Sequence, residues 1–252
     1  MDIQNKSILA KLLAAENVTL KHRNVPTASF DLKSRTLTLP IWEEMSVDLY
    51  DLFIGHEVGH ALFTPMMGWH DNVMEYGPAF KSFLNVIEDA RIERKIKSKF
   101  PGLVRSFHRG YSELFEKDFF GVTQRDISTL GLIDRINLHF KIGGLLGVPF
   151  SETEQQYIPR IEAAESWEDV VVIAEELFDE AKTLAMLLVT RSLNQILNQA
   201  VKAKMILSLL SKKHLSKNLH QAALQISMLR KTMVLKIQYL RLTLRSVKMK
   251  AR

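Results

Sequence analysis

The stretch His56-Glu57-Val58-Gly59-His60 decides how this 252-residue chain is interpreted. Two histidines four residues apart on a helix lie on the same face, so both imidazoles can bind one metal ion. The glutamate between them can accept a proton from a water molecule that the metal binds. We therefore interpret His56 and His60 as ligands of Zn²⁺ and Glu57 as the general base of a hydrolase.

The residues around this motif predict a helix. Apolar residues and the two histidines recur at steps of three and four along residues 48–63, the spacing of one helix face. Pro65 ends this helix, because the residue before a proline is pushed out of helical geometry. The alternative is a core helix that carries two histidines by chance. That alternative leaves Glu57 buried between imidazoles without a metal, which is energetically costly.

Composition bounds the class of protein. The chain has no Cys, which excludes disulfides and thiolate zinc sites, and its hydrophobic content of 46% is enough for a core. The first residues lack the basic start and apolar run of a signal peptide. No apolar stretch reaches the length of a membrane span. We therefore expect a soluble cytoplasmic protein of one or two domains.

The net charge of +6 hides two halves of opposite charge. Residues 1–180 hold all 28 acidic residues against 19 Lys and Arg, a net charge of −9. Residues 181–252 hold 15 Lys and Arg and no acid, a net charge of +15, and they also lack Gly, Pro, Phe and Trp. Such an abrupt change predicts a boundary. We expect one domain at residues 1–182 and a basic, poorly ordered tail at residues 183–252.

The pattern along the chain predicts an α+β fold that is mostly helical. A small N-terminal β-sheet is expected before the motif helix, because residues 17–22, 28–32 and 36–39 alternate like strands and residues 33–35 can turn. An edge strand of such a sheet can accept an extended peptide as a further strand. The predicted helices besides the motif helix are residues 7–16, 80–99, 103–117, 127–142, 151–164 and 167–184.

A third metal ligand is expected on the helix at residues 80–99, because zinc sites of this type take a carboxylate from a later helix. Glu88 and Asp89 are both within reach in the sequence. We slightly favour Asp89, because Glu93 lies one turn further along the same face. Glu93 is then expected to hold one of the histidines in place by a hydrogen bond. The alternative is a solvated face on which these acids pair with neighbouring Arg and Lys residues.

His70 is a competing ligand, ten residues after His60. A related zinc motif has its third histidine six residues after the second histidine, and Met66 occupies that position here. We therefore rank His70 below Glu88 and Asp89 as the third ligand. The sequence also contains candidate donors to an oxyanion, among which it does not choose. These candidates are His70, Tyr76, Arg91, His108 and Tyr111.

Together, the segments His56–Pro65 and Asn85–Arg94 resemble the metallopeptidase-like region of CobT-type cobaltochelatase subunits and of their bacteriophage relatives. The resemblance covers about residues 15–180 and implies a zincin-like fold, a Zn²⁺ site, a peptide or protein substrate and, for a phage protein, the host cytoplasm. Members often work beside a MoxR-type AAA+ ATPase. The leading prediction is a zinc-dependent metallopeptidase. The alternative is a non-proteolytic assembly module that serves such an ATPase.

The tail departs from that family, in which an acidic linker and a von Willebrand factor A domain typically follow. At face value, residues 181–252 are a basic, amphipathic helical region for nucleic acid or an anionic membrane, which we rank last because no clean helical apolar face persists along it. A second interpretation is that the tail is a frameshifted acidic linker. Leu is repeatedly followed by a residue whose codon can begin with A, and the shifted frame can then encode Glu. In that case a downstream domain is missing.

Overall fold

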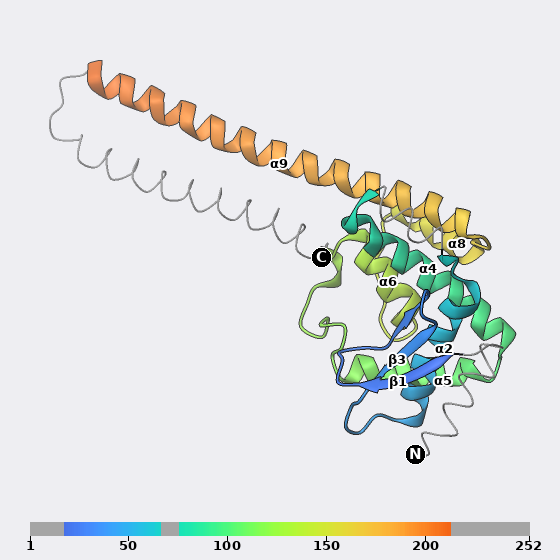
Figure 1. The fold of residues 1–252 in the computed structure, drawn as a ribbon. Helices are drawn as coiled ribbons and strands as arrows, with labels where there is room; N and C mark the ends of the chain where they lie inside the picture. The colour runs from blue at the N-terminus through green and yellow to red at the C-terminus, as the bar shows by residue number, and fades with distance from the viewer. Residues whose placement is uncertain (1–17, 67–75, 213–252) are drawn as a thin grey trace. The chain divides into compact units, whose positions relative to one another are not determined.

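The computed structural model describes residues 18–66 and 76–212 of the chain (Figure 1). Its contacts divide the chain into two units, residues 1–178 and residues 179–252. The first unit combines one three-stranded sheet with a larger number of helices, so the fold is α+β and mostly helical. The helix predicted at residues 7–16 lies outside the described residues.

The sheet lies near the N-terminal end of the first unit. Its strands are β1 (Thr19–Arg23), β2 (Ser29–Asp31) and β3 (Thr36–Pro40), in the order β1-β3-β2. β2 and β3 form the antiparallel pair that the turn at residues 33–35 predicts, and Asp31 accepts the backbone N–H groups of Lys33 and Ser34 there. β1 pairs with β3 in parallel, which strand alternation does not reveal. Leu37 and Leu39 of the central strand are fully buried.

The motif helix is α2 (Val47–Phe63), one residue longer at its start than predicted. Ser46 caps its N-terminus, since its side chain accepts the backbone N–H of Leu49. At the other end, the backbone N–H of Thr64 still bonds to the carbonyl of His60. α2 packs against the sheet on one side and against two later helices on the other, so it is buried around most of its circumference.

Helices make up most of the rest of the described chain. They are α4 (Pro78–Lys99), α5 (Leu103–Glu116), the short 3-10 helix η1 (Ile127–Thr129), α6 (Leu132–Ile142), α7 (Glu152–Gln155), α8 (Tyr157–Ala163) and α9 (Trp167–Lys212). The helix predicted at residues 127–142 is interrupted at Gly131, which has an extended backbone. The helix predicted at residues 151–164 is divided between α7 and α8, where Pro159 has no N–H to offer the carbonyl of Gln155.

Two apolar clusters form the core of the first unit. The first gathers side chains from the sheet, α2 and α5, including Leu37 and Phe107. The second gathers side chains from α4, α6, α8 and the start of α9, including Phe80 and Val170. α4 belongs to both clusters, since its Ile96 is part of the first. α4 is therefore held from two sides, which fixes its rotation relative to α2.

Glycines let α2 approach its neighbours closely. A Cβ added at Gly59 of α2 would lie 2.8 Å from Cδ1 of Ile92 in α4. A Cβ added at Gly110 of α5 would lie 2.9 Å from Cβ of Leu52 in α2. Both distances are shorter than van der Waals contact, so only glycine permits this packing without a shift. The backbones of α2 and α4 are close enough for short side chains to meet between them.

The helix predicted at residues 167–184 is longer in the structure. α9 continues to Lys212, so residues 183–212, which belong to the predicted tail, are helical in the structure. This stretch has no Gly or Pro and is rich in Leu, which favours helix locally. Residues 213–252 lie outside the described residues. Ser166 caps the start of α9, since its side chain accepts the backbone N–H of Asp169.

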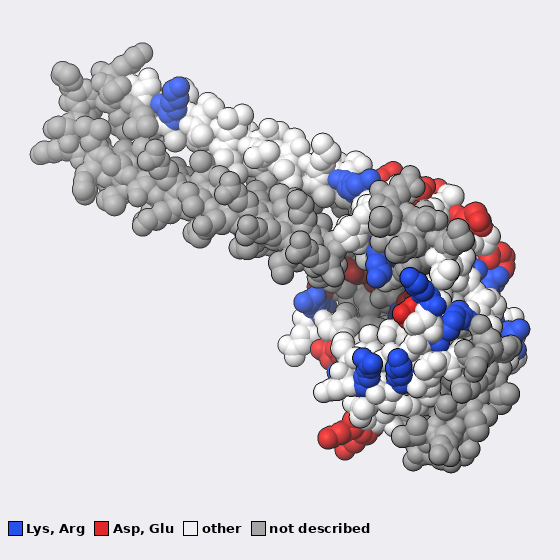
Figure 2. Space-filling view, in the orientation of Figure 1, with Lys and Arg blue, Asp and Glu red and all other residues white. Residues whose placement is uncertain are grey.

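The described part of the second unit is the continuation of α9 from Asp179. Its apolar side chains are largely exposed, among them Leu187, Leu193 and Met205. In the view of Figure 2, acidic and basic residues are mixed over the first unit. After Glu180 the chain has no acidic residue, so all of its charged residues there are Lys or Arg. Within the described ranges, no helix combines the length and the apolar character needed to cross a membrane.

Candidate metal centre

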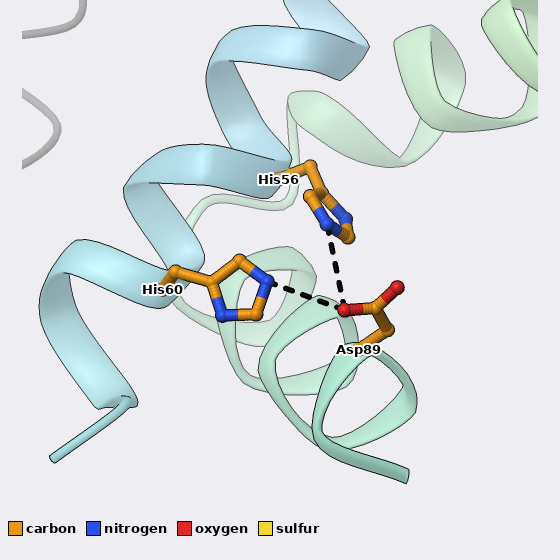
Figure 3. Close-up of side chains that lie close together, drawn as sticks. All are labelled: His56, His60 and Asp89. Carbon is orange, nitrogen blue, oxygen red and sulfur yellow. Dashed lines mark ion pairs between the residues drawn. The ribbon is translucent and has the colours of Figure 1, made fainter. Parts of the chain in front are cut away.

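The structure brings His56, His60 and Asp89 together between α2 and α4 (Figure 3). One ligand atom from each residue lies within 4.8 Å of the other two. Nε2 of His60 is 3.2 Å from Oδ1 of Asp89, and Nε2 of His56 is 3.6 Å from the same oxygen. The two rings are inclined at 77° to one another, with centroids 5.0 Å apart. Both histidines therefore direct the same nitrogen toward one carboxylate oxygen.

This set of donor atoms fits a divalent metal. Two imidazole nitrogens and one carboxylate oxygen are a common ligand set of catalytic zinc, which keeps a fourth position open for water or substrate. The three side chains are 15% to 19% exposed, so the group is largely buried but still reached by solvent. The three residues could therefore hold a metal ion.

Glu93, the residue predicted to orient a ligand, forms a hydrogen bond with the His56 nitrogen that faces away from Asp89. Nδ1 of His56 is 3.0 Å from Oε1 of Glu93, and Tyr111 of α5 donates its hydroxyl to the same oxygen. An N–H at Nδ1 leaves the lone pair of the neutral ring on Nε2. Burial alone would lower the pKa of His56, but the carboxylates of Asp89 and Glu93 outweigh it and raise that pKa.

His60 is held by a chain of groups that the sequence did not predict. Thr64 donates its single hydroxyl proton to Oε1 of Glu88 over 2.5 Å. Its Oγ1 lies 2.9 Å from Nδ1 of His60, so this nitrogen carries a proton and donates it. The lone pair of neutral His60 is then on Nε2, the nitrogen that faces Asp89. Both histidines thus reach the same tautomer through different partners.

Of the two acids left open as the third ligand, the structure places Asp89 with the histidines, and Glu88 elsewhere. The Glu88 side chain is fully buried, and Arg91 donates to both of its oxygens at 2.8 Å. Arg91 also donates to the backbone carbonyls of Phe63 and Glu165. Neighbouring residues on a helix point about 100° apart, so Glu88 and Asp89 face different surroundings.

Glu57 lies on α2 between the two histidines and is only 6% exposed. Burial raises the pKa of Glu57, while the charged forms of His56 and His60 act against that rise. A buried carboxylate with a raised pKa can take up and release a proton closer to neutral pH than an exposed one. The burial of Glu57 and the direction of its pKa shift are compatible with the role of general base that the motif predicts.

Lys141 of α6 is a member of this site that sequence reasoning missed. Its Nζ lies 2.9 Å from Oδ2 of Asp89, 3.4 Å from the hydroxyl of Tyr111 and 3.7 Å from Oε1 of Glu93. Burial would raise the pKa of Asp89, but Lys141 and His56 hold it far below its usual range. No sequence signal marks Lys141, because it lies on a distant helix whose pattern indicates only packing.

Within the described residues, the structure does not place the other candidate residues, considered as oxyanion donors or as a competing ligand, among the three ligand side chains. Arg91 and Tyr111, considered as oxyanion donors, instead support Glu88 and Glu93. His108 is exposed on α5, and His70 lies outside the described residues. Tyr76 is 38% exposed, and its ring packs against the Phe80 ring with centroids 4.7 Å apart.

Comparison with known proteins brings no identification. No protein-family model, no curated protein and no solved structure matches this chain.

Proposed function

We propose that this chain is a zincin-like metallopeptidase that holds Zn²⁺ through His56, His60 and Asp89 and hydrolyses peptide bonds with Glu57 as general base. The proposal combines the motif with the arrangement of the three ligand side chains. Its substrate class, a peptide or protein, comes from the resemblance of the two motif segments to the metallopeptidase-like region of CobT-type subunits.

One observation carries the metal assignment. His56 donates from Nδ1 to Glu93. His60 donates from Nδ1 to Thr64. Both rings, when neutral, therefore point the Nε2 lone pair at Oδ1 of Asp89. With both rings neutral, three electron-rich atoms face one place, and either a metal ion between them or protonation of the rings relieves their repulsion. A divalent metal satisfies all three atoms at once, which a single proton cannot do.

The chain's own residues account for the other needs of peptide hydrolysis. When bound, the metal would polarise a water molecule and the substrate carbonyl. Glu57 would accept the proton of the attacking water and pass it to the amine that leaves. Glu93 and Thr64 keep the two histidines in the tautomer that can bind. An extended peptide could pair with an edge of the sheet, and β2, one of its edges, contacts α2.

The decisive experiment compares the wild type with Glu57→Gln. We expect both proteins to bind one equivalent of Zn²⁺, measured by elemental analysis. Hydrolysis of a peptide library should fall by about 100- to 10,000-fold in Glu57→Gln, because the proton acceptor is lost. Glu116→Gln, at an exposed position on α5, is the matched control and should keep full activity.

Two outcomes would contradict this proposal. Absence of Zn²⁺ from the wild type would remove the metal centre. Full occupancy by Zn²⁺ without hydrolysis of any peptide would favour the alternative, an assembly module in which the metal serves structure.

A further inference from the structure

We propose that Lys141 is a positioning residue that holds one oxygen of Asp89 away from the metal, so that Asp89 binds through the other oxygen alone. This inference rests on the proposed function, because it concerns how one ligand of that metal site is presented. It adds a third helix, α6, to a site that the motifs assign to α2 and α4 only.

The two oxygens of Asp89 have separate partners. Oδ2 accepts a hydrogen bond from Nζ of Lys141 at 2.9 Å. Oδ1 faces Nε2 of both histidines. A carboxylate can bind a metal through one oxygen or through both. The ammonium group on Oδ2 holds that oxygen on the side of Lys141 and favours binding of the metal through Oδ1. Binding through one oxygen keeps a coordination position available for water or substrate.

Lys141 is itself held firmly enough to act in this way. Its side chain is 14% exposed. Its Nζ lies 3.4 Å from the Tyr111 hydroxyl and 5.6 Å from the centre of the Tyr111 ring. It is also 3.7 Å from Oε1 of Glu93, the oxygen that holds His56. One ammonium group therefore contacts both the ligand carboxylate and the carboxylate that orients another ligand.

A simpler role for Lys141 is charge compensation for two buried carboxylates. The two roles predict opposite effects on metal affinity. If Lys141 only supplies positive charge, its removal lessens repulsion of the metal and tightens binding. If Lys141 positions Asp89, its removal releases the carboxylate and weakens binding, as the loss of groups that hold metal ligands usually does.

The experiment uses Co²⁺ as the probe, bound to the full 252-residue chain. Co²⁺ occupies sites of this ligand type, and its visible absorption weakens as the coordination number rises. We expect Lys141→Met to bind Co²⁺ about ten-fold more weakly than the wild type. We also expect weaker visible absorption per bound ion, because the released Asp89 can bind through both oxygens. Lys141→Arg, which keeps a charged donor, should retain the wild-type spectrum.

Lys95→Met is the matched control. Nζ of Lys95 lies 2.8 Å from Glu165 and 6.0 Å from the centre of the Phe63 ring, so the variant loses a comparable ion pair without touching the ligands. Circular dichroism establishes folding, and Lys141→Gln replaces Lys141→Met if the latter is unfolded. Equal or tighter Co²⁺ binding with an unchanged spectrum in the neutral variant would overturn the positioning role and leave the proposed metal site standing. Failure of the wild type to bind Co²⁺ would overturn both.

Discussion

Two arginine–glutamate pairs in the first unit each form two hydrogen bonds but have very different surroundings. In the Arg91–Glu88 pair behind the metal centre, the side chains are 4% and 0% exposed. In the Arg160–Glu176 pair between α8 and α9, they are 40% and 42% exposed. In both pairs, two nitrogens of the arginine reach two carboxylate oxygens. Burial rather than geometry decides what such a pair contributes, because a buried charge that loses its partner cannot turn to water.

The largest effect is expected from removing the buried cation. Arg91→Met leaves the Glu88 carboxylate buried with Thr64 as its remaining donor. The free energy of unfolding should fall by about 3–5 kcal/mol, measured by urea denaturation. Arg160→Met removes an equally well-formed but exposed pair, and the loss should be about 0.5 kcal/mol. Similar losses in the two variants would mean that burial does not distinguish the pairs.

The hydrogen bonds that join His60, Thr64 and Glu88 should also affect metal binding. The expected effect is smaller than that of removing Arg91. Thr64→Val removes the oxygen that accepts Nδ1–H of His60. We expect Zn²⁺ affinity to fall by about 10- to 100-fold, measured by competition with a chelating dye. Thr183→Val is the counterpart in the second unit, where an exposed Thr donates to the carbonyl of Asp179. An equal loss of Zn²⁺ affinity in Thr183→Val would contradict a specific role for Thr64.

A pair of intermediate burial should show a pH dependence of stability. In the Arg135–Glu154 pair, the side chains are 10% and 21% exposed. Hydrogen bonds from Arg135 lower the pKa of Glu154 from 4.5 to about 2. A lowered pKa means that the stabilisation is complete above about pH 4.5 and is lost as the pH falls toward 2. We expect a contribution of about 1 kcal/mol, intermediate between the other two pairs.

The measurement compares unfolding of the wild type and Glu154→Gln at pH 6 and pH 3, with a chelator present to keep the metal site out of the comparison. The difference between the two proteins should be largest at pH 6 and smaller at pH 3. Glu116→Gln, at an exposed position of α5, is the control for the loss of one carboxylate. A constant difference for Glu154→Gln would show that the pair does not titrate with folding.

Much of the secondary structure followed from local signals in the sequence. The start and end of α2 depend on Ser46 and Pro65, which act within a few residues along the chain. The sheet was predicted from strand alternation and a turn, and all three strands are present. The errors in the predicted helix bounds also have local causes. Gly131 and Pro159 interrupt segments that the apolar pattern predicts as single helices, and α9 extends beyond its predicted end at residue 184.

What the sequence determined by itself is the set of groups that a regular helix brings together: the two histidines with Glu57, and Asp89 with Glu93 one turn on. Helical periodicity alone places these side chains, so no contact between helices is needed to predict them. The division of charge along the chain is likewise a property of the sequence.

The tertiary structure decided what depends on the rotation and approach of separate helices. Glu88 and Asp89 were nearly equal candidates, and the packing of α4 between two apolar clusters turned Asp89 toward the histidines and Glu88 toward Arg91. The contact between Lys141 and Asp89 spans 52 residues, and no local pattern encodes it. A helix repeats its faces every turn, but which face meets which neighbour is set only when the whole core packs.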